Sequence, residues 1–310
     1  MTPVQQPAAP RPPPPAVGVP LIIDTDSKYL PFPPCTQHSR GHSMIDTCAP
    51  CIAVSFDVDD VAAVCLAHAL ADAGEANLIA IGYNSGYPEG VGALDVLNRW
   101  YHRDVPLGAY KGSFGREPLD EGGDWVRGPY VGDLIRNWEP IITEHSMVPD
   151  AVEVYRRALT AAADRSVVLA AIGFPTNVMA LLRSPADSIS ALSGRELIEQ
   201  KVKQVVWQGG WYDSPVLSVP RKGNGKQTFN WNCGGEWYNH SGCYGSAREA
   251  VGGMPPSVQK IFSDVGDDVW TGSRLSWCAP LRNPCRQAFI DYLGFGNARP
   301  SWDPIVVLAA

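Results

Sequence analysis

Five aspartates lie in two short stretches of the sequence, and together they could hold a divalent cation. They are Asp24, Asp26, Asp57, Asp59 and Asp60. The N-terminus of a helix stabilises one or two carboxylates by about 0.3–1 kcal/mol each, which does not account for five. Crowded carboxylates repel one another unless a cation lies among them, and a set of oxygen ligands is what Ca²⁺ and Mg²⁺ prefer. The pattern therefore favours a metal site over a solvated acidic surface.

Both stretches lie at the expected ends of secondary-structure elements. Residues 21–23 form an apolar run that predicts a buried strand, and this strand ends at the first two aspartates. The other three aspartates open a helical pattern with Val61 and Val64 on its apolar face, and Gly74 is a suitable C-cap for that helix. The sequence thus predicts that the carboxylates stand at a strand end and at the following helix start.

Farther along the chain, apolar runs alternate with helical patterns. We expect strands over residues 78–82, 105–110, 166–173 and 201–208, and helices over residues 90–101, 149–163 and 177–182. The run at 166–173 is apolar throughout, as in a central parallel strand. The alternation predicts an α/β fold with a doubly wound, mostly parallel sheet flanked by helices. In such sheets ligands bind at the carboxyl ends of the strands.

Two further positions could complete a site at that edge. Thr176 follows the strand expected over residues 166–173, where a backbone carbonyl could be a neutral oxygen ligand. Asp303 stands between Trp302 and Pro304, just before the apolar residues 305–310, which resemble the start of a helix without its remainder. Taken alone, an Asp-Pro pair is more typical of a turn than of a site.

Taken together, these motifs resemble those of the inosine–uridine-preferring nucleoside hydrolases, in particular a fungal branch with a DVDD version of the N-terminal motif. In chain order they are Asp24-Thr25-Asp26, Asp57-Val58-Asp59-Asp60, Tyr83-Asn84-Ser85-Gly86, Gly173-Phe174-Pro175-Thr176-Asn177, Gly209-Gly210, Phe229-Asn230 and Trp302-Asp303-Pro304. The resemblance covers residues 21–26 and 56–310. It implies a nucleoside hydrolase-like domain over residues 21–310 that splits the N-glycosidic bond of ribonucleosides to ribose and free base, in purine and pyrimidine salvage.

The resemblance also implies roles for individual residues. The family's Ca²⁺ ligands match Asp26, Asp60, the carbonyl of Thr176 and Asp303. Its substrate-binding groups match Asp59, Asn84 and Asn230, which would hold the ribose hydroxyls. Asp26 matches the carboxylate that deprotonates a metal-activated water, so direct displacement with inversion is expected. Asp24 and Asp57 match acids that do not touch the metal themselves but orient the residues that do.

Two departures from the family pattern concern catalysis. Where the family often has a histidine that protonates the leaving base, this chain has Trp302, which can stack on a purine but is no proton donor. Where an acidic residue often precedes the Phe-Asn pair, this chain has Thr228. A catalytically impaired protein that binds ribose or nucleosides is therefore an alternative to an active hydrolase.

A second alternative is a phosphatase of the haloacid-dehalogenase type. In that class an aspartate after the first strand attacks phosphorus, which Asp24 could do, and Gly266-Asp267-Asp268 could be the later acidic motif. Residue Lys28 stands where a threonine or valine would be expected. This hypothesis also leaves Asp59, Asp60 and the Trp302-Asp303 pair without a role.

Residues 27–55 interrupt a motif that the family keeps as one tight loop. Ser27-Lys28-Tyr29 could be encoded by a splice-donor-like sequence, so we interpret much of the segment as a translated intron. The rival interpretation is a zinc-binding insertion. Its candidate ligands are Cys35, His38, His42, Cys48 and Cys51.

Composition restricts the class of partner. The chain has 310 residues, a net charge of −7 and no cluster of lysines and arginines, which disfavours nucleic acid and anionic membrane as partners. No apolar window is long enough to span a bilayer. The expected partner is a small-molecule nucleoside, and the pattern is compatible with a homo-oligomer.

The chain termini and the cysteines leave the compartment open. Residues 1–20 are rich in proline, which predicts a disordered tail, and they contain no signal-peptide pattern. The pairs Cys233/Cys243 and Cys278/Cys285 could be local disulfides or free thiols. The sequon Asn239-His240-Ser241 matters only in a secreted protein.

Overall fold

The computed structural model describes residues 18–25, 57–84, 88–112, 130–209, 246–263, 265–266 and 268–310. In this part of the chain six parallel strands form one sheet, in the order β3-β2-β1-β4-β5-β6. The strands are β1 (Val19–Thr25), β2 (Ala76–Tyr83), β3 (Leu107–Ala109), β4 (Val167–Ala171), β5 (Val202–Gln208) and β6 (Gln259–Ser263). Two short strands, β7 (Trp270–Thr271) and β8 (Arg299–Pro300), pair antiparallel. The expected doubly wound parallel sheet is confirmed.

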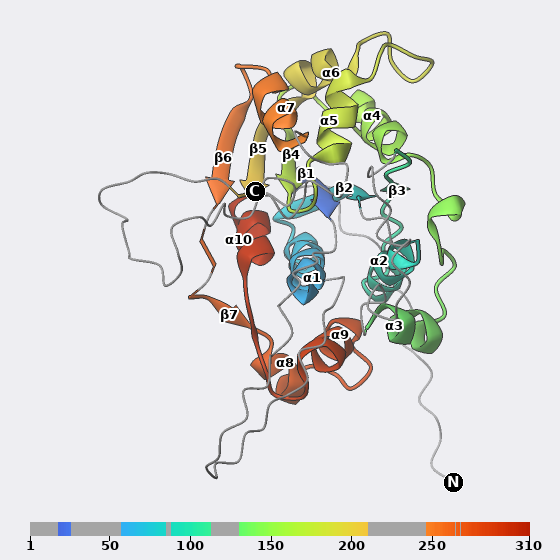
Figure 1. Ribbon diagram of the computed structural model, residues 1–310, viewed down its shortest axis with the longest axis vertical. Helices are drawn as coiled ribbons and strands as arrows, with labels where there is room; N and C mark the ends of the chain where they lie inside the picture. Colours follow the sequence, from blue (N-terminus) through green and yellow to red (C-terminus); the bar gives the residue numbers. More distant parts are fainter. Residues whose placement is uncertain are drawn as a thin grey trace, which may run out of the picture.

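Helices cover both faces of the sheet (Figure 1). The helices are α1 (Val58–Asp72), α2 (Gly90–Trp100), α3 (Val131–Trp138), α4 (Ala151–Ala161), α5 (Thr176–Arg183), α6 (Gly194–Lys201), α7 (Ser246–Gly253), α8 (Ser273–Cys278), α9 (Pro284–Leu293) and α10 (Trp302–Ala309). One hydrophobic cluster joins the sheet to α1, α2, α3, α9 and α10, here called the α1 layer. A second cluster joins it to α4, α5, α6 and α7, the α4 layer.

Strand β1 lies in the interior of the sheet, and its side chains alternate between the two layers. Leu21 and Ile23 pack in the α1 layer, whereas Ile22 packs in the α4 layer. β1 pairs with β2 on one side and with β4 on the other, so the strand order reverses beside it. In open α/β sheets ligands bind outside the carboxyl ends of the strands at such a switch point. Of the first two predicted site aspartates, Asp24 is the second-last residue of this strand, and Asp26 follows the strand in sequence.

Helix α1 begins and ends at the expected positions. Its first turn carries Asp59 and Asp60, and its last turn ends in a Schellman motif. Gly74 adopts a φ of 77° there, and the Glu75 N–H donates to the Leu70 carbonyl over 2.9 Å. A residue with a Cβ would be strained in this conformation, which explains why the sequence signal was reliable.

Several elements were not expected from the sequence. Helices α3, α6, α7, α8 and α9 and strand β6 lie in regions where we predicted nothing. The helix expected to start in residues 305–310 begins earlier, at Trp302, so the Asp-Pro pair lies in a first helical turn and not in a β-turn. Val19 and Pro20, which we had placed in the tail, belong to β1.

Some predictions fall on residues outside the described ranges. They include the insertion over residues 27–55 with its zinc hypothesis, the site residues Asp26 and Asn230, and Cys233 and Cys243. Of the two states left open for the other pair, the structure has free thiols at Cys278 and Cys285. In the described residues, no helix is long and apolar enough to cross a membrane.

Candidate functional site

Three buried carboxylates meet at the carboxyl edge of the sheet. Asp59 and Asp60 lie in the first turn of α1, and Asp303 lies in the first turn of α10. Oxygens of the three groups all lie within 4.8 Å of one another, and the residues are 1%, 5% and 1% exposed. The structure therefore brings together acids from opposite ends of the chain that the sequence analysis had selected.

Packing between helices α1 and α10 fixes this triad. The two helices lie side by side in the α1 layer, with Val306 and Val307 of α10 fully in the core. The Asp303 backbone N–H points to Asp59 Oδ2 at 3.4 Å, so the helix starts face each other. The hydroxyl of Thr25, the last residue of β1, donates to Asp60 Oδ1 over 2.6 Å. Strand and helix starts thus converge on one point.

The residues of this triad suit a hard divalent cation. At an effective dielectric constant near 20, two unit charges less than 5 Å apart repel by about 3 kcal/mol or more. A bound cation relieves this repulsion, and carboxylate oxygens are the ligands that Ca²⁺ or Mg²⁺ would take. Thr176, the first residue of α5, is 1% exposed, and its hydroxyl has no hydrogen-bond partner among the described residues. The buried donor set fits a metal, while the role of each ligand stays a prediction.

Asp24 lies on the opposite face of β1, in a network of its own. Tyr155 Oη donates to Asp24 Oδ1 over 2.7 Å, and Asn177 Nδ2 donates to the same oxygen over 2.8 Å. Burial raises the pKa of Asp24 to about 7, although the hydrogen bonds from Asn177 and Tyr155 lower it in part. Both of these donors are themselves buried, so this carboxylate oxygen is already engaged by the protein. Its surroundings therefore fit a positioning role better than attack on phosphorus.

Asn84 is held at the end of β2 by the chain segment after β4. Its side-chain amide donates to the Phe174 carbonyl and accepts from the Phe174 N–H, the latter over 3.1 Å. The Asn84 amide also interacts with the Asp24 carboxylate and contributes to lowering the pKa of that group. The two backbone bonds fix the amide plane, which is what a group that orients a sugar requires. Contact with ribose stays a prediction.

The negative charge of Asp57 is neutralised by Arg299, a residue that the sequence analysis missed. Both terminal oxygens of Asp57 accept from the Arg299 guanidinium, one of them from Nε over 2.9 Å. The guanidinium also lies over the Trp302 ring, 4.9 Å from its centroid. Arg299 therefore ties the start of α1 to the start of α10 and holds the indole in place. No local sequence signal links residues 57 and 299.

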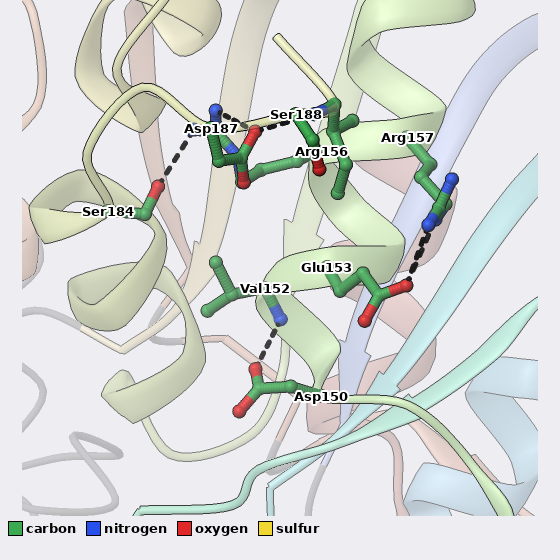
Figure 2. A pocket seen from close by; sticks show the side chains of 9 residues that line it. Asp150, Val152, Glu153, Arg156, Arg157, Ser184, Asp187 and Ser188 are labelled. Carbon is green, nitrogen blue, oxygen red and sulfur yellow. Dashed lines mark hydrogen bonds and ion pairs between the residues drawn. The ribbon is translucent and has the colours of Figure 1, made fainter.

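An open cavity of about 530 Å³ lies elsewhere, over α4 and the segment after α5 (Figure 2). Arg156 is 1% exposed and donates to both carboxylate oxygens of Asp187 over 2.8 Å and to Ser184 Oγ over 3.0 Å. The guanidinium also donates to the Ser190 and Leu192 carbonyls. These bonds occupy the arginine in holding the loop after α5, and none of the predicted site residues lines this cavity.

Comparison with solved structures identifies the fold. A plant nucleoside hydrolase superposes with a TM-score of 0.53 at 15% identity, over 96% of this chain and 78% of that chain. An inosine-uridine preferring nucleoside hydrolase from Bacillus anthracis gives a TM-score of 0.54 at 14% identity, over 94% of this chain and 80% of that chain. The chain has the nucleoside hydrolase fold. No protein family model and no curated protein matches the sequence.

Within this nucleoside hydrolase fold the acid triad lies at the switch point of the sheet, beside β1. Of the predicted site residues, Asp59, Asp60 and Asp303 are brought together. Asp24 is held by Tyr155 of α4 and Asn177 of α5, and Asn84 is held by the backbone of Phe174. The sequence analysis quoted Phe174 and Asn177 within a motif but did not pair them with Asn84 and Asp24, and it missed Tyr155. Tyr155 gave no signal, because it lies 131 positions from the carboxylate that it binds.

Proposed function

We propose that this protein is a Ca²⁺-dependent nucleoside hydrolase that cleaves the N-glycosidic bond of ribonucleosides. The observation that carries the proposal is the meeting of Asp59, Asp60 and Asp303 within 4.8 Å at the switch point of a nucleoside hydrolase fold. The sequence resemblance adds the finer assignments: the inosine–uridine-preferring family with its DVDD motif, calcium as the metal, and a role in nucleoside salvage.

In this proposal Asp60, Asp303, the Thr176 carbonyl and Asp26 hold the ion, with Asp59 beside them. When bound, the ion would supply Lewis-acid polarisation of a water and of the sugar hydroxyls. The protein's own part is to bind and orient the ribose with Asp59, Asn84 and Asn230. A sugar fixed in this way presents its anomeric carbon to the water in a near-attack geometry.

Asp26 would accept the proton of the attacking water as a general base. The C–N bond breaks as the C–O bond forms, and the base leaves from the opposite face of the sugar with the bonding electron pair. One attacking water and no carboxylate nucleophile predict inversion at the anomeric carbon. Trp302, whose ring is held by Arg299, would stack on the departing base.

A second candidate function is nucleoside binding without turnover. The observation in its favour is that Trp302 stands where the family often has a proton-donating histidine. In the described part of the chain, the two buried or half-buried histidines, His68 and His145, have their pKa lowered to about 4 by burial and are neutral at pH 7. Neither belongs to a motif of the family.

Ribose release from a nucleoside panel tests the proposal. The assay measures reducing sugar from inosine, uridine, adenosine and cytidine, with Ca²⁺ and with a chelator, for the full chain and for a variant lacking residues 27–55. We expect release that stops on chelation and in Asp60→Asn, while Asp291→Asn, a half-buried acid of α9, retains activity. Nucleoside binding in calorimetry without ribose release would favour the second candidate. Hydrolysis of an aryl phosphate without ribose release would contradict both.

A further inference from the structure

Two polar side chains at the ends of strands β5 and β6 have no role in the proposal above. Gln208 is the last residue of β5, and Ser263 is the last residue of β6 and its partner in the strand register. They are 4% and 8% exposed. The amide nitrogen and oxygen of Gln208 and the hydroxyl of Ser263 have no hydrogen-bond partner among the described residues. The Gly209 N–H donates to the Ser263 carbonyl over 2.8 Å and keeps the two strand ends together.

Strand alternation shows which layer these side chains face. In β5 Val206 packs in the α1 layer and Trp207 in the α4 layer, so Gln208 points toward the α1 layer. In β6 Phe262 packs in the α4 layer, so Ser263 points the same way as Gln208. Both polar groups therefore project from the carboxyl edge on the side of the sheet that holds α1 and α10.

Helix α10 places the acid triad on this same side. Gln204, in the middle of β5, donates to the Ala309 carbonyl at the C-terminal end of α10 over 3.3 Å. The other end of the helix carries Asp303, which meets the start of α1 beyond the strand ends. In Figure 1, β5 points toward α10, and the helix continues past the strand tip. Asp303 and Gln208 thus share one face and one edge of the sheet.

A buried carboxamide without a hydrogen-bond partner destabilises the ligand-free protein, because the carboxamide gives up its hydrogen bonds to water on folding. An amide beside a hydroxyl offers donors and acceptors without charge. Such a pair complements a neutral group that both donates and accepts hydrogen bonds. An anionic group is disfavoured there by the three carboxylates on the same face.

We propose that Gln208 and Ser263 are specificity-determining residues that bind a neutral hydroxyl or amide-like group of the substrate. The inference rests on the proposed function and deepens it. Two parts of a nucleoside carry this chemistry, namely a hydroxyl of the sugar and an N–H/C=O edge of the base. The bound group forms the hydrogen bonds that the buried Gln208 amide lacks, so binding offsets the free-energy cost of burying that amide.

Substrate analogues paired with variants test this directly. The variants are Gln208→Met, which keeps the side-chain length without polar atoms, and Ser263→Ala. The control is Gln204→Met, on the same strand and face. The panel compares inosine and uridine with their 2′-, 3′- and 5′-deoxy forms and with analogues lacking a carbonyl on the base, and kcat/KM for ribose or deoxyribose release is measured.

For the parent nucleosides we expect Gln208→Met to lower kcat/KM at least tenfold, which is about 1.4 kcal/mol. For the one analogue that lacks the contacted group, the variant and the wild type will differ less than twofold. A deoxy analogue in that position assigns the contact to the sugar, and a base analogue assigns it to the base. An equal loss over the whole panel, or no loss, overturns the inference.

A thermal measurement judges the inference apart from catalysis. Without ligand, we expect Gln208→Met to raise the Tm by about 2 °C or more, because it removes unsatisfied buried polar atoms. A lower Tm would mean that Gln208 is a satisfied structural residue and would overturn the inference. If the wild type releases no sugar, the proposed function fails. The inference then requires inosine to raise the Tm of the wild type and not that of Gln208→Met.

Discussion

The acid triad makes a prediction about stability that needs no enzymatic assay. Each pair of ionised carboxylates among Asp59, Asp60 and Asp303 lies within 4.8 Å and repels by about 3 kcal/mol at an effective dielectric constant near 20. Without a cation this repulsion acts against the fold. Replacing Asp303 by asparagine removes two of the three pairs. We therefore expect Asp303→Asn to melt at a higher temperature than the wild type when both are in chelator.

Calcium reverses this order in the same experiment. A ligand at a hundred times its Kd stabilises a protein by about 2.7 kcal/mol, so Ca²⁺ should raise the Tm of the wild type by about 4 °C. In the proposed site Asp303→Asn replaces a charged ligand by a neutral amide oxygen, so this variant should gain much less. The assay is calorimetry or a thermal shift for each protein, with EDTA and with increasing Ca²⁺.

Asp291→Asn is the matched control for the loss of a carboxylate. Asp291 is a half-buried acid of α9 whose pKa burial raises to about 6, and it lies outside the triad. Its replacement can stabilise the protein, yet the shift produced by Ca²⁺ should stay at the wild-type value. The reasoning is refuted if EDTA leaves the Tm of the wild type unchanged and Asp303→Asn lowers it. Groups of the protein itself would then balance the three charges.

Three further predictions concern the scaffold. Burial, with a smaller contribution from Arg103, lowers the pKa of His68 from 6.5 to about 4. On acidification the unfolded chain therefore takes up a proton at His68 at a higher pH than the folded protein does. Stability should therefore fall by up to about 3 kcal/mol between pH 6.5 and pH 4, and chemical denaturation of His68→Phe should show a shallower fall. Arg156→Met should lower the free energy of unfolding by about 1–3 kcal/mol, because it removes a buried guanidinium that donates to Asp187, Ser184 and two backbone carbonyls, against less than about 1 kcal/mol for the exposed Arg157 on the same helix. Gly82→Ala would place a Cβ against the Tyr155 hydroxyl, so we expect a loss of about 1–3 kcal/mol in the free energy of unfolding in the same denaturation assay.

The sequence predicted the centre of the sheet and the start of α1 because the signals there are local. The strand β4 is buried at every position, and a continuous apolar run of this kind is typical of a strand covered on both faces. Edge strand β6 was missed because four of its five residues are exposed or half-buried, which leaves no such run. Its sequence resembles that of an ordinary surface loop.

Some of the missed helices did carry a signal. Helix α6 begins with a capping box in which Ser193 accepts from the Glu196 N–H, and the S-x-x-E spacing is visible in the sequence. Helix α9 begins with Asn283 as N-cap and Pro284 at the first helical position, which is a common helix start. A search for caps in addition to apolar periodicity would have placed both helices.

The candidate site also contains residues that a local sequence signal marks and residues that no such signal marks. Asp59 and Asp60 could be selected because they crowd one helix start, and Asp303 was selected only through the family resemblance. The contacts that hold the acids of the site could not be predicted, because they join residues far apart in sequence. Arg299 lies 242 positions from Asp57, and no period or spacing in a single sequence marks such a pair.

Strand β1 links the two halves of the site by geometry alone. Successive side chains of a strand point to opposite faces, so Asp24 enters the α4 layer and Thr25 enters the α1 layer. Asp24 is bound by Tyr155 and Asn177, whereas Thr25 donates to Asp60 of the acid triad. A shift of the strand end would therefore move the buried acid network and the triad at once. We therefore expect a substitution at the fully buried Asp24 to weaken the proposed metal site through β1.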